Sequence, residues 1–176
     1  MVRKELNLRD AIELYLETTE AELKSWKTVY GYEEALKLFL DFCGNIPLED
    51  LNEDHLRSFI LHETGRRREV NGEMVAYSTE TIYKRYKVVK TLVKWLHSRK
   101  YIVEDITQYT RNPHRDETLP EVLSEDQIRK VFRILKGHEY RDLVIFETFL
   151  YTGIRLNELA ELSLDDLDFE HGRMKV

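Results

Sequence analysis

Apolar residues that recur every three or four positions run through this chain, and residues 79–98 show the pattern most clearly. Six apolar residues fall on one side of a helix that turns 100° per residue: Ile82, Tyr86, Val89, Leu92, Val93 and Leu96. Ser78 or Thr79 is a suitable N-cap for that helix. Because an amphipathic helix must bury its apolar side against other elements, the pattern predicts a packed helical domain.

The same periodicity predicts three helices earlier in the chain. They cover residues 7–20, residues from about Ser25 or Lys27 to Cys43, and about 52–64. Asn7 is a credible N-cap for the first, and Gly44-Asn45-Ile46-Pro47 closes the second. Between the third helix and residue 79, Asn71-Gly72 lies between short strand-like flanks. Asn-Gly is the strongest local signal for a β-hairpin, so we expect a small hairpin near 68–75; a long loop is the competing interpretation.

Residues 105–120 resemble a linker because they contain Pro113 and Pro120, and the residue before each proline is pushed into an extended conformation. Ser124 and Gln127 then form a capping box that starts a helix ending near Leu135. A helix over residues 139–151 follows and stops at Gly153, with Tyr151 expected in the core. Residues 167–176 are typical of a turn that enters a β-strand. The predicted fold is therefore mainly α.

The composition excludes several classes of protein. No apolar run reaches the ~18–20 residues of a membrane span, and no signal sequence opens the chain, so we expect a cytoplasmic protein. The single Cys43 excludes an internal disulfide. One cysteine and six scattered histidines give no zinc-ligand spacing, so neither a metal nor another cofactor is expected.

The net charge of −6 argues against a nucleic-acid partner, but the charge is unevenly spread. Residues 66–100 carry ten Lys/Arg against three Asp/Glu, while the segments on either side are acidic. On the helix over 79–98, Lys84, Lys87, Lys90 and Lys94 lie opposite the apolar side. A solvated lysine face is one interpretation, and contact with the phosphates of a polyanion is the other.

A second candidate site follows Gly153. Arg155 and Glu158 are three residues apart, and we expect Arg155 in the first turn of a short helix whose backbone N–H groups favour an anion. A guanidinium at that end is a plausible phosphate clamp. An ordinary surface Arg–Glu pair is the simpler interpretation. Ile154, Leu159 and Leu162 can turn toward a core.

The wider motif adds a resemblance. Thr152-Gly153-x-Arg155-x-x-Glu158-Leu159, followed by Leu164-x-Asp166-Leu167-Asp168-Phe169, resembles the first-arginine motif of the tyrosine recombinases, the phage-integrase and Xer-like family. The resemblance implies a SAM-like core-binding domain of about four helices over residues 1–104, a linker over 105–120, and the first part of a catalytic domain over 121–176. That last part would be α-rich and end at its first β-strand.

Family members bind duplex DNA and break and rejoin its strands through a 3′-phosphotyrosyl intermediate, without metal or ATP. By resemblance, Arg155 is the first catalytic arginine, Glu158 its support, and Asp166 an acidic position of the motif. The residues expected to contact DNA are Lys27, Arg66, Arg67, Arg68, Ser78, Thr79, Lys84, Lys87, Lys90, Thr91, Lys94, Arg111 and Arg115. The family's catalytic lysine, His-x-x-Arg motif and nucleophilic tyrosine have no counterpart in residues 1–176, so we expect DNA binding without cleavage by this chain alone.

Three hypotheses stay open at this point. The chain is part of a site-specific recombinase that assembles as a tetramer on DNA, a non-catalytic DNA-binding module or regulator derived from an integrase, or a helical protein-interaction domain. Steep salt dependence of binding to duplex DNA separates the first two from the third.

Overall fold

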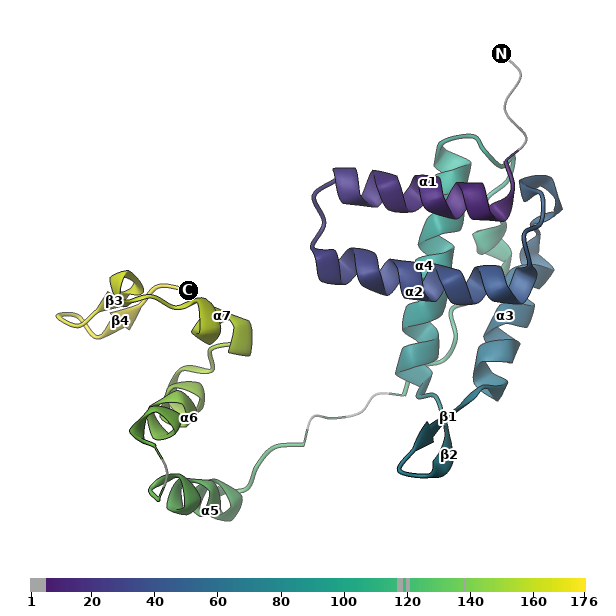
Figure 1. Cartoon of the computed structure of the whole chain (residues 1–176). Helices are drawn as coiled ribbons and strands as arrows, with labels where there is room; N and C mark the ends of the chain where they lie inside the picture. Colours follow the sequence, from purple (N-terminus) through teal and green to yellow (C-terminus); the bar gives the residue numbers. More distant parts are fainter. Residues whose placement is uncertain (1–5, 117–118, 120, 138) are drawn as a thin grey trace. The chain divides into compact units, whose positions relative to one another are not determined.

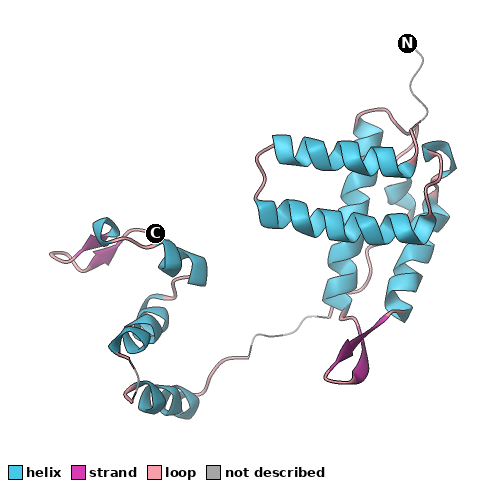
Figure 2. Ribbon diagram, in the orientation of Figure 1, coloured by secondary structure: helices cyan, strands magenta, loops and turns pink. Residues whose placement is uncertain are grey.

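Helices make up most of the structure, which is a computed structural model describing residues 6–116, 119, 121–137 and 139–176 (Figures 1 and 2). The mainly α prediction is confirmed. The chain divides into two units, Met1–Thr118 and Leu119–Val176, and each is described by itself below.

The first unit contains the four predicted helices. They are α1 (Leu8–Ala21), α2 (Trp26–Cys43), α3 (Glu53–Gly65) and α4 (Thr79–Ser98), with a short 3₁₀ helix η1 (Leu48–Asp50) between α2 and α3. A side chain caps the start of each α-helix by accepting a backbone N–H bond: Asn7, Ser25, Asn52 and Ser78 respectively. These bonds satisfy donors that the first turn of a helix leaves free, which is why each helix begins where it does.

The core of this unit is built around α4. All six apolar residues predicted on its inner side are buried. Figure 1 shows α1 and α2 side by side and crossing α4, with α3 running alongside it. Phe39 from α2 and Phe59 from α3 meet edge to face, with ring centroids 5.1 Å apart. Because α4 is packed from several directions, its remaining polar face has a fixed orientation in the unit.

A β-hairpin joins α3 to α4, as Asn71-Gly72 predicted. Strand β1 (Arg67–Val70) pairs antiparallel with β2 (Glu73–Ala76), with Arg68 opposite Val75. Both turn residues have positive φ, 53° at Asn71 and 84° at Gly72. Such a turn matches the twist of the strands it joins, and Asn and Gly tolerate it best.

The first unit continues beyond α4. A 3₁₀ helix, η2 (Ile106–Tyr109), lies in the segment expected to be a linker and packs against α3 and α4. Asp105 accepts a bond from the backbone N–H of Thr107, 3.0 Å away, and Thr107 is 2% exposed. The cap and the buried side chain tie this turn, which follows the boundary expected at residue 104, to the helical unit.

The second unit is small. Its helices are α5 (Glu125–Leu135), α6 (Tyr140–Thr152) and α7 (Leu156–Glu161), followed by η3 (Leu164–Asp166) and a hairpin of β3 (Leu167–Asp168) and β4 (Arg173–Met174). The Ser124–Gln127 capping box is present. Gly153 ends α6 with φ of 67°, a conformation that favours glycine.

Few side chains of the second unit are enclosed. Among its described residues only Ile154 is buried, at 8% exposed, while Leu159 and Leu162 are half-buried. The prediction that Tyr151 is a core residue is wrong, since it is 81% exposed. The physical reason is the size of the unit: Val144, Phe146 and Leu150 on the same helix also stay 39–46% exposed.

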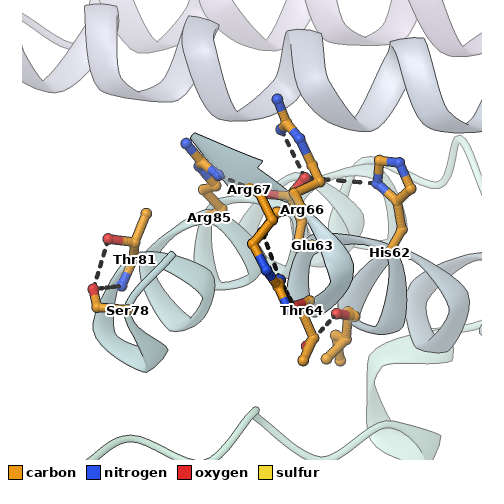
Figure 3. A network of polar contacts seen from close by, with 9 residues as sticks. His62, Glu63, Thr64, Arg66, Arg67, Ser78, Thr81 and Arg85 are labelled. Atoms are coloured by element: carbon orange, nitrogen blue, oxygen red, sulfur yellow. Dashed lines mark hydrogen bonds and ion pairs between the residues drawn. The ribbon is translucent and has the colours of Figure 1, made fainter. Parts of the chain in front are cut away.

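A buried carboxylate connects α3, the hairpin and α4 (Figure 3). Glu63 on α3 is 1% exposed. Its Oε1 accepts a bond from Arg66 Nη1 at 2.8 Å, and its Oε2 accepts one from Arg85 Nη1 at 2.6 Å. The Arg85 guanidinium also lies over the ring of Tyr77, 4.2 Å from its centroid. The network therefore fixes both ends of the hairpin to the two helices that it joins.

Replacing Glu63 with Ala should lower the free energy of unfolding by about 3 kcal/mol, because two partly buried guanidinium groups lose their counter-charge. Urea unfolding of the whole chain, followed by helical circular dichroism, measures this. Glu13→Ala, a change at an exposed position of α1, is the control and should stay within about 0.5 kcal/mol of the parent. Equal effects of the two substitutions would contradict a structural role for the network.

Candidate nucleic-acid interface

The polar face of α4 presents the predicted lysines to solvent. Lys84, Lys87 and Lys94 are exposed, and Lys90 and Thr91 are half-buried on the same helix. Lys84 Nζ lies 3.2 Å from Glu80 Oε1, one turn earlier. We call Lys84, Lys87, Lys90 and Lys94 the lysine face. The buried apolar side of α4 holds this face in place, so its charges form a fixed strip.

The hydroxyl groups at the start of α4 already have partners within the chain. Ser78 Oγ accepts the backbone N–H of Thr81 at 3.2 Å, as an N-cap does. Thr79 Oγ1 donates to Asp116 Oδ2 at 2.8 Å. Arg115 Nε lies 3.4 Å from Glu80 Oε2. The structure thus places Arg115 against the start of α4, the helix that carries Thr79 and the lysine face.

Two of the three consecutive arginines, which were predicted to contact DNA, bond to groups within the chain. Arg66 bonds to the buried carboxylate of Glu63. That bond and the nearby charge raise the pKa of the Arg66 guanidinium. Arg67 Nη1 donates to the carbonyl oxygens of Thr64, Gly65 and Arg66 at 2.9–3.1 Å, which are groups that the end of α3 leaves without helical partners.

The remaining predicted DNA contacts are less constrained. The Arg68 guanidinium lies 5.7 Å from the centre of the Tyr77 ring. Lys27 is in the first turn of α2, with Nζ 5.8 Å from the centre of the Trp26 ring. Arg111 is exposed shortly after η2. All three side chains keep polar atoms that can face a ligand.

Arg155 is the N-cap of α7 and not a residue of its first turn, which corrects the predicted position. Its backbone is extended there, with φ −77° and ψ 153°. Glu158 Oε2 accepts the Arg155 backbone N–H at 2.8 Å, and Glu158 Oε1 accepts Nη1–H at 2.7 Å. Two hydrogen bonds thus join the two residues.

The pair holds the guanidinium without hiding it. The Arg155 side chain is 84% exposed. Bonds from the Arg155 backbone and side chain lower the pKa of the Glu158 carboxyl, and the Glu158 side chain raises the pKa of Arg155. Glu158 takes the Arg155 backbone N–H, and the guanidinium is the charged group that this pair presents to solvent. A planar guanidinium with one edge held can offer its other N–H groups to a phosphate.

The structure also shows polar partners that the periodicity did not reveal. Asp166 Oδ2 accepts bonds from the Ser163 hydroxyl at 2.7 Å and the Ser163 N–H at 2.9 Å, and these lower the pKa of the Asp166 carboxyl. Asn112 and Asp116, in the segment after η2, bond to Lys90 and Thr79 of α4. Irregular segments carry no repeating pattern, so only the Pro113 signal marked this region.

The residues that the structure describes contain neither a candidate metal site nor a candidate membrane-spanning helix. No group of three or more His, Cys, Asp or Glu side chains there could hold a metal ion. No helix there is long and apolar enough to cross a membrane.

Comparison with known proteins finds relatives of this chain. Residues 121–176 match the model of the phage integrase family. A tyrosine recombinase XerC from Roseiflexus sp. (strain RS-1) is 25% identical over 176 residues, covering 96% of this chain and 53% of the relative. A tyrosine recombinase XerA from Pyrococcus furiosus is 35% identical over 66 residues, 38% of this chain and 23% of the relative.

The fold has a solved counterpart. A lambda integrase tetramer bound to a Holliday junction superposes with a TM-score of 0.75 at 15% identity, covering 93% of this chain and 46% of that one. At that identity the similarity concerns the fold. The chain spans about half the length of the curated relatives it matches, 53% and 48% for two XerC proteins. The family match over residues 121–176 and the Xer relatives support a member of the tyrosine recombinase family.

Proposed function

We propose that the chain is the DNA-binding and first catalytic portion of a site-specific tyrosine recombinase. The observation that carries this proposal is the Arg155–Glu158 pair, which lies within the segment that matches the family and exposes a guanidinium whose geometry is fixed. In such an enzyme a tyrosine attacks a DNA phosphate, and the guanidinium stabilises the charge that develops on the phosphate oxygens.

The first unit supplies DNA affinity in this proposal. The lysine face projects from a helix that the core holds rigid, so several ammonium groups can meet successive phosphates without ordering a loop. The chain as a whole is acidic, with a formal net charge of −6, so binding depends on this local strip. The lambda integrase structures that share the fold contain bound DNA, which supports the same partner class.

The second unit supplies one catalytic group and an incomplete core. Phe146 and Leu150 on α6 and Leu156 on α7 stay 45–70% exposed. Apolar area of this kind is normally covered in a folded protein. We propose that the remainder of a catalytic domain covers it, bringing the second arginine, the lysine and the nucleophilic tyrosine, and that the complete enzyme assembles on DNA.

A helical protein-interaction domain is the second candidate function. The observation favouring it is a group of exposed apolar side chains at the α1–α2 corner: Leu23 at 92%, Trp26 at 72% and Tyr30 at 57%. Such a domain would bind duplex DNA no more tightly than a charge-matched acidic control protein binds it. Salt dependence of DNA binding therefore decides between the two candidates.

Replacing Lys84, Lys87 and Lys94 together with Ala should weaken binding to duplex DNA. The plot of log Kd against log salt concentration should lose up to ~3 in slope, about one per phosphate contact. Fluorescence anisotropy across a salt series measures it. The control replaces Arg9, Lys24 and Lys37, three exposed cations, so that the net charge changes equally. If both triple variants behave alike, net charge and not the lysine face drives binding.

Arg155→Ala should abolish covalent protein–DNA adducts yet leave most duplex affinity intact, because a phosphate clamp acts chiefly on the transition state. The assay mixes this chain with the C-terminal half of a matched Xer recombinase and detects adducts on a denaturing gel. Arg173→Ala, at an exposed arginine of the same unit, serves as the control and should keep adduct formation. Adducts that persist with Arg155→Ala would exclude it from catalysis.

A further inference from the structure

Residues Asn112–Asp116 lie along the polar face of α4, and we call this segment the strap. Three polar contacts fasten it: Lys90 Nζ donates to Asn112 Oδ1 at 3.2 Å, Arg115 Nε pairs with Glu80 Oε2 at 3.4 Å, and Thr79 Oγ1 donates to Asp116 Oδ2 at 2.8 Å. The partners on α4 fall in reverse order, so the strap runs antiparallel to the helix.

The geometry of the strap follows from its sequence. Pro113 pushes Asn112 toward an extended conformation, and the strap has no helix or strand. From Thr79 to Lys90, α4 rises by roughly 16 Å at 1.5 Å per residue. Five extended residues cover roughly 13 Å between their first and last Cα atoms, and side chains supply the rest. An extended strap is thus the form that reaches both anchors.

Asp116 makes the most specific of these contacts. Besides accepting the Thr79 hydroxyl, it donates its backbone N–H to Thr79 Oγ1 at 3.1 Å. The threonine hydroxyl acts as donor and acceptor toward one residue, which fixes both the backbone and the side chain at that point. Asp116 Oδ1 also lies 3.4 Å from His114 Nε2 in an exposed pair.

Fastening the strap decides where Arg115 points. Its guanidinium lies 5.5 Å from the centre of the Tyr83 ring and pairs with Glu80 through Nε. The other oxygen of Glu80 lies 3.2 Å from Lys84 Nζ. One carboxylate therefore holds two cations side by side at the start of the lysine face. The Arg115 side chain remains 52% exposed, so its terminal amino groups can reach a phosphate.

We propose that Asp116 and Asn112 are positioning residues: they hold the strap on α4 so that Arg115 joins the lysine face as a phosphate contact. The inference rests on the proposed DNA-binding function. It runs against simple electrostatics, because an acidic residue beside a DNA surface repels phosphates unless it acts through its neighbours. The opposite role, in which Asp116 competes with phosphate for Thr79, predicts the opposite sign.

Asp116→Ala tests the inference, because the two roles predict opposite changes in the affinity for duplex DNA. It should weaken duplex binding about fivefold to tenfold at about 0.1 M salt and lower the salt slope by about one, as loss of one phosphate contact implies. Asp116→Asn keeps an oxygen that accepts the Thr79 hydroxyl and should retain parental affinity. Asp50→Ala, at an exposed acid of η1, controls for the change in charge and should not weaken binding.

Two further variants establish that the effect passes through the strap. Thr79→Val removes the hydroxyl and should reproduce the loss seen with Asp116→Ala. Arg115→Ala should cause a similar loss in the parent and little further loss when combined with Asp116→Ala, because the two changes remove the same contact. Thermal unfolding of each variant should match that of the parent, since every changed side chain is exposed or half-buried.

The outcomes separate cleanly. Tighter binding by Asp116→Ala overturns the positioning role and makes Asp116 a competitor of phosphate. If the parent and Asp116→Ala bind duplex DNA with the same affinity, the positioning role is overturned and the proposed function stands. Failure of the parent itself to bind duplex DNA overturns the proposed function, and the positioning role falls with it.

Discussion

A carboxylate that lies almost wholly inside a helical unit must be neutralised there, because an unpaired charge in that environment is very costly. Glu63 meets this requirement with two guanidinium groups, Arg66 from the base of the hairpin and Arg85 from α4. The three residues come from α3, from the segment between α3 and β1, and from α4. Their pairing sets the direction in which the chain leaves α3, returns through the hairpin and enters α4.

Two kinds of arginine follow from where their carboxylate partners lie. The side chain of Glu63 is 1% exposed and draws Arg85 into the protein, leaving it 20% exposed. The side chains of Glu80 and Glu158 are 40% and 33% exposed, and their partners Arg115 and Arg155 remain 52% and 84% exposed. A surface carboxylate orients a guanidinium while leaving part of it to solvent. An Arg–Glu ion pair therefore supports packing when it is buried and presents a cation to solvent when it lies at the surface.

The sequence predicted the helices well because their signals are local and repeated. The apolar period of α4, the caps at Ser78 and Ser124 and the Asn71-Gly72 turn each act within a few residues. Glu63 was not predicted as buried, since a glutamate in an amphipathic helix is normally taken as solvated, and its partner Arg85 is 22 positions away, beyond any local pattern. Tyr151 was misplaced because periodicity reports which side of a helix is apolar, not whether anything covers it. The strap depends on contacts between residues more than 20 positions apart, which no local pattern contains.

We propose that the lysine face of α4 and the strap form the surface that meets DNA. Titrating a short duplex into the ¹⁵N-labelled chain and mapping the changes in amide chemical shift tests it most directly. The account predicts that the largest changes on the first unit fall on residues 84–94 of α4 and on the strap, with small changes at the α1–α2 corner. Changes concentrated on Leu23, Trp26 and Tyr30, with α4 unaffected, would contradict it.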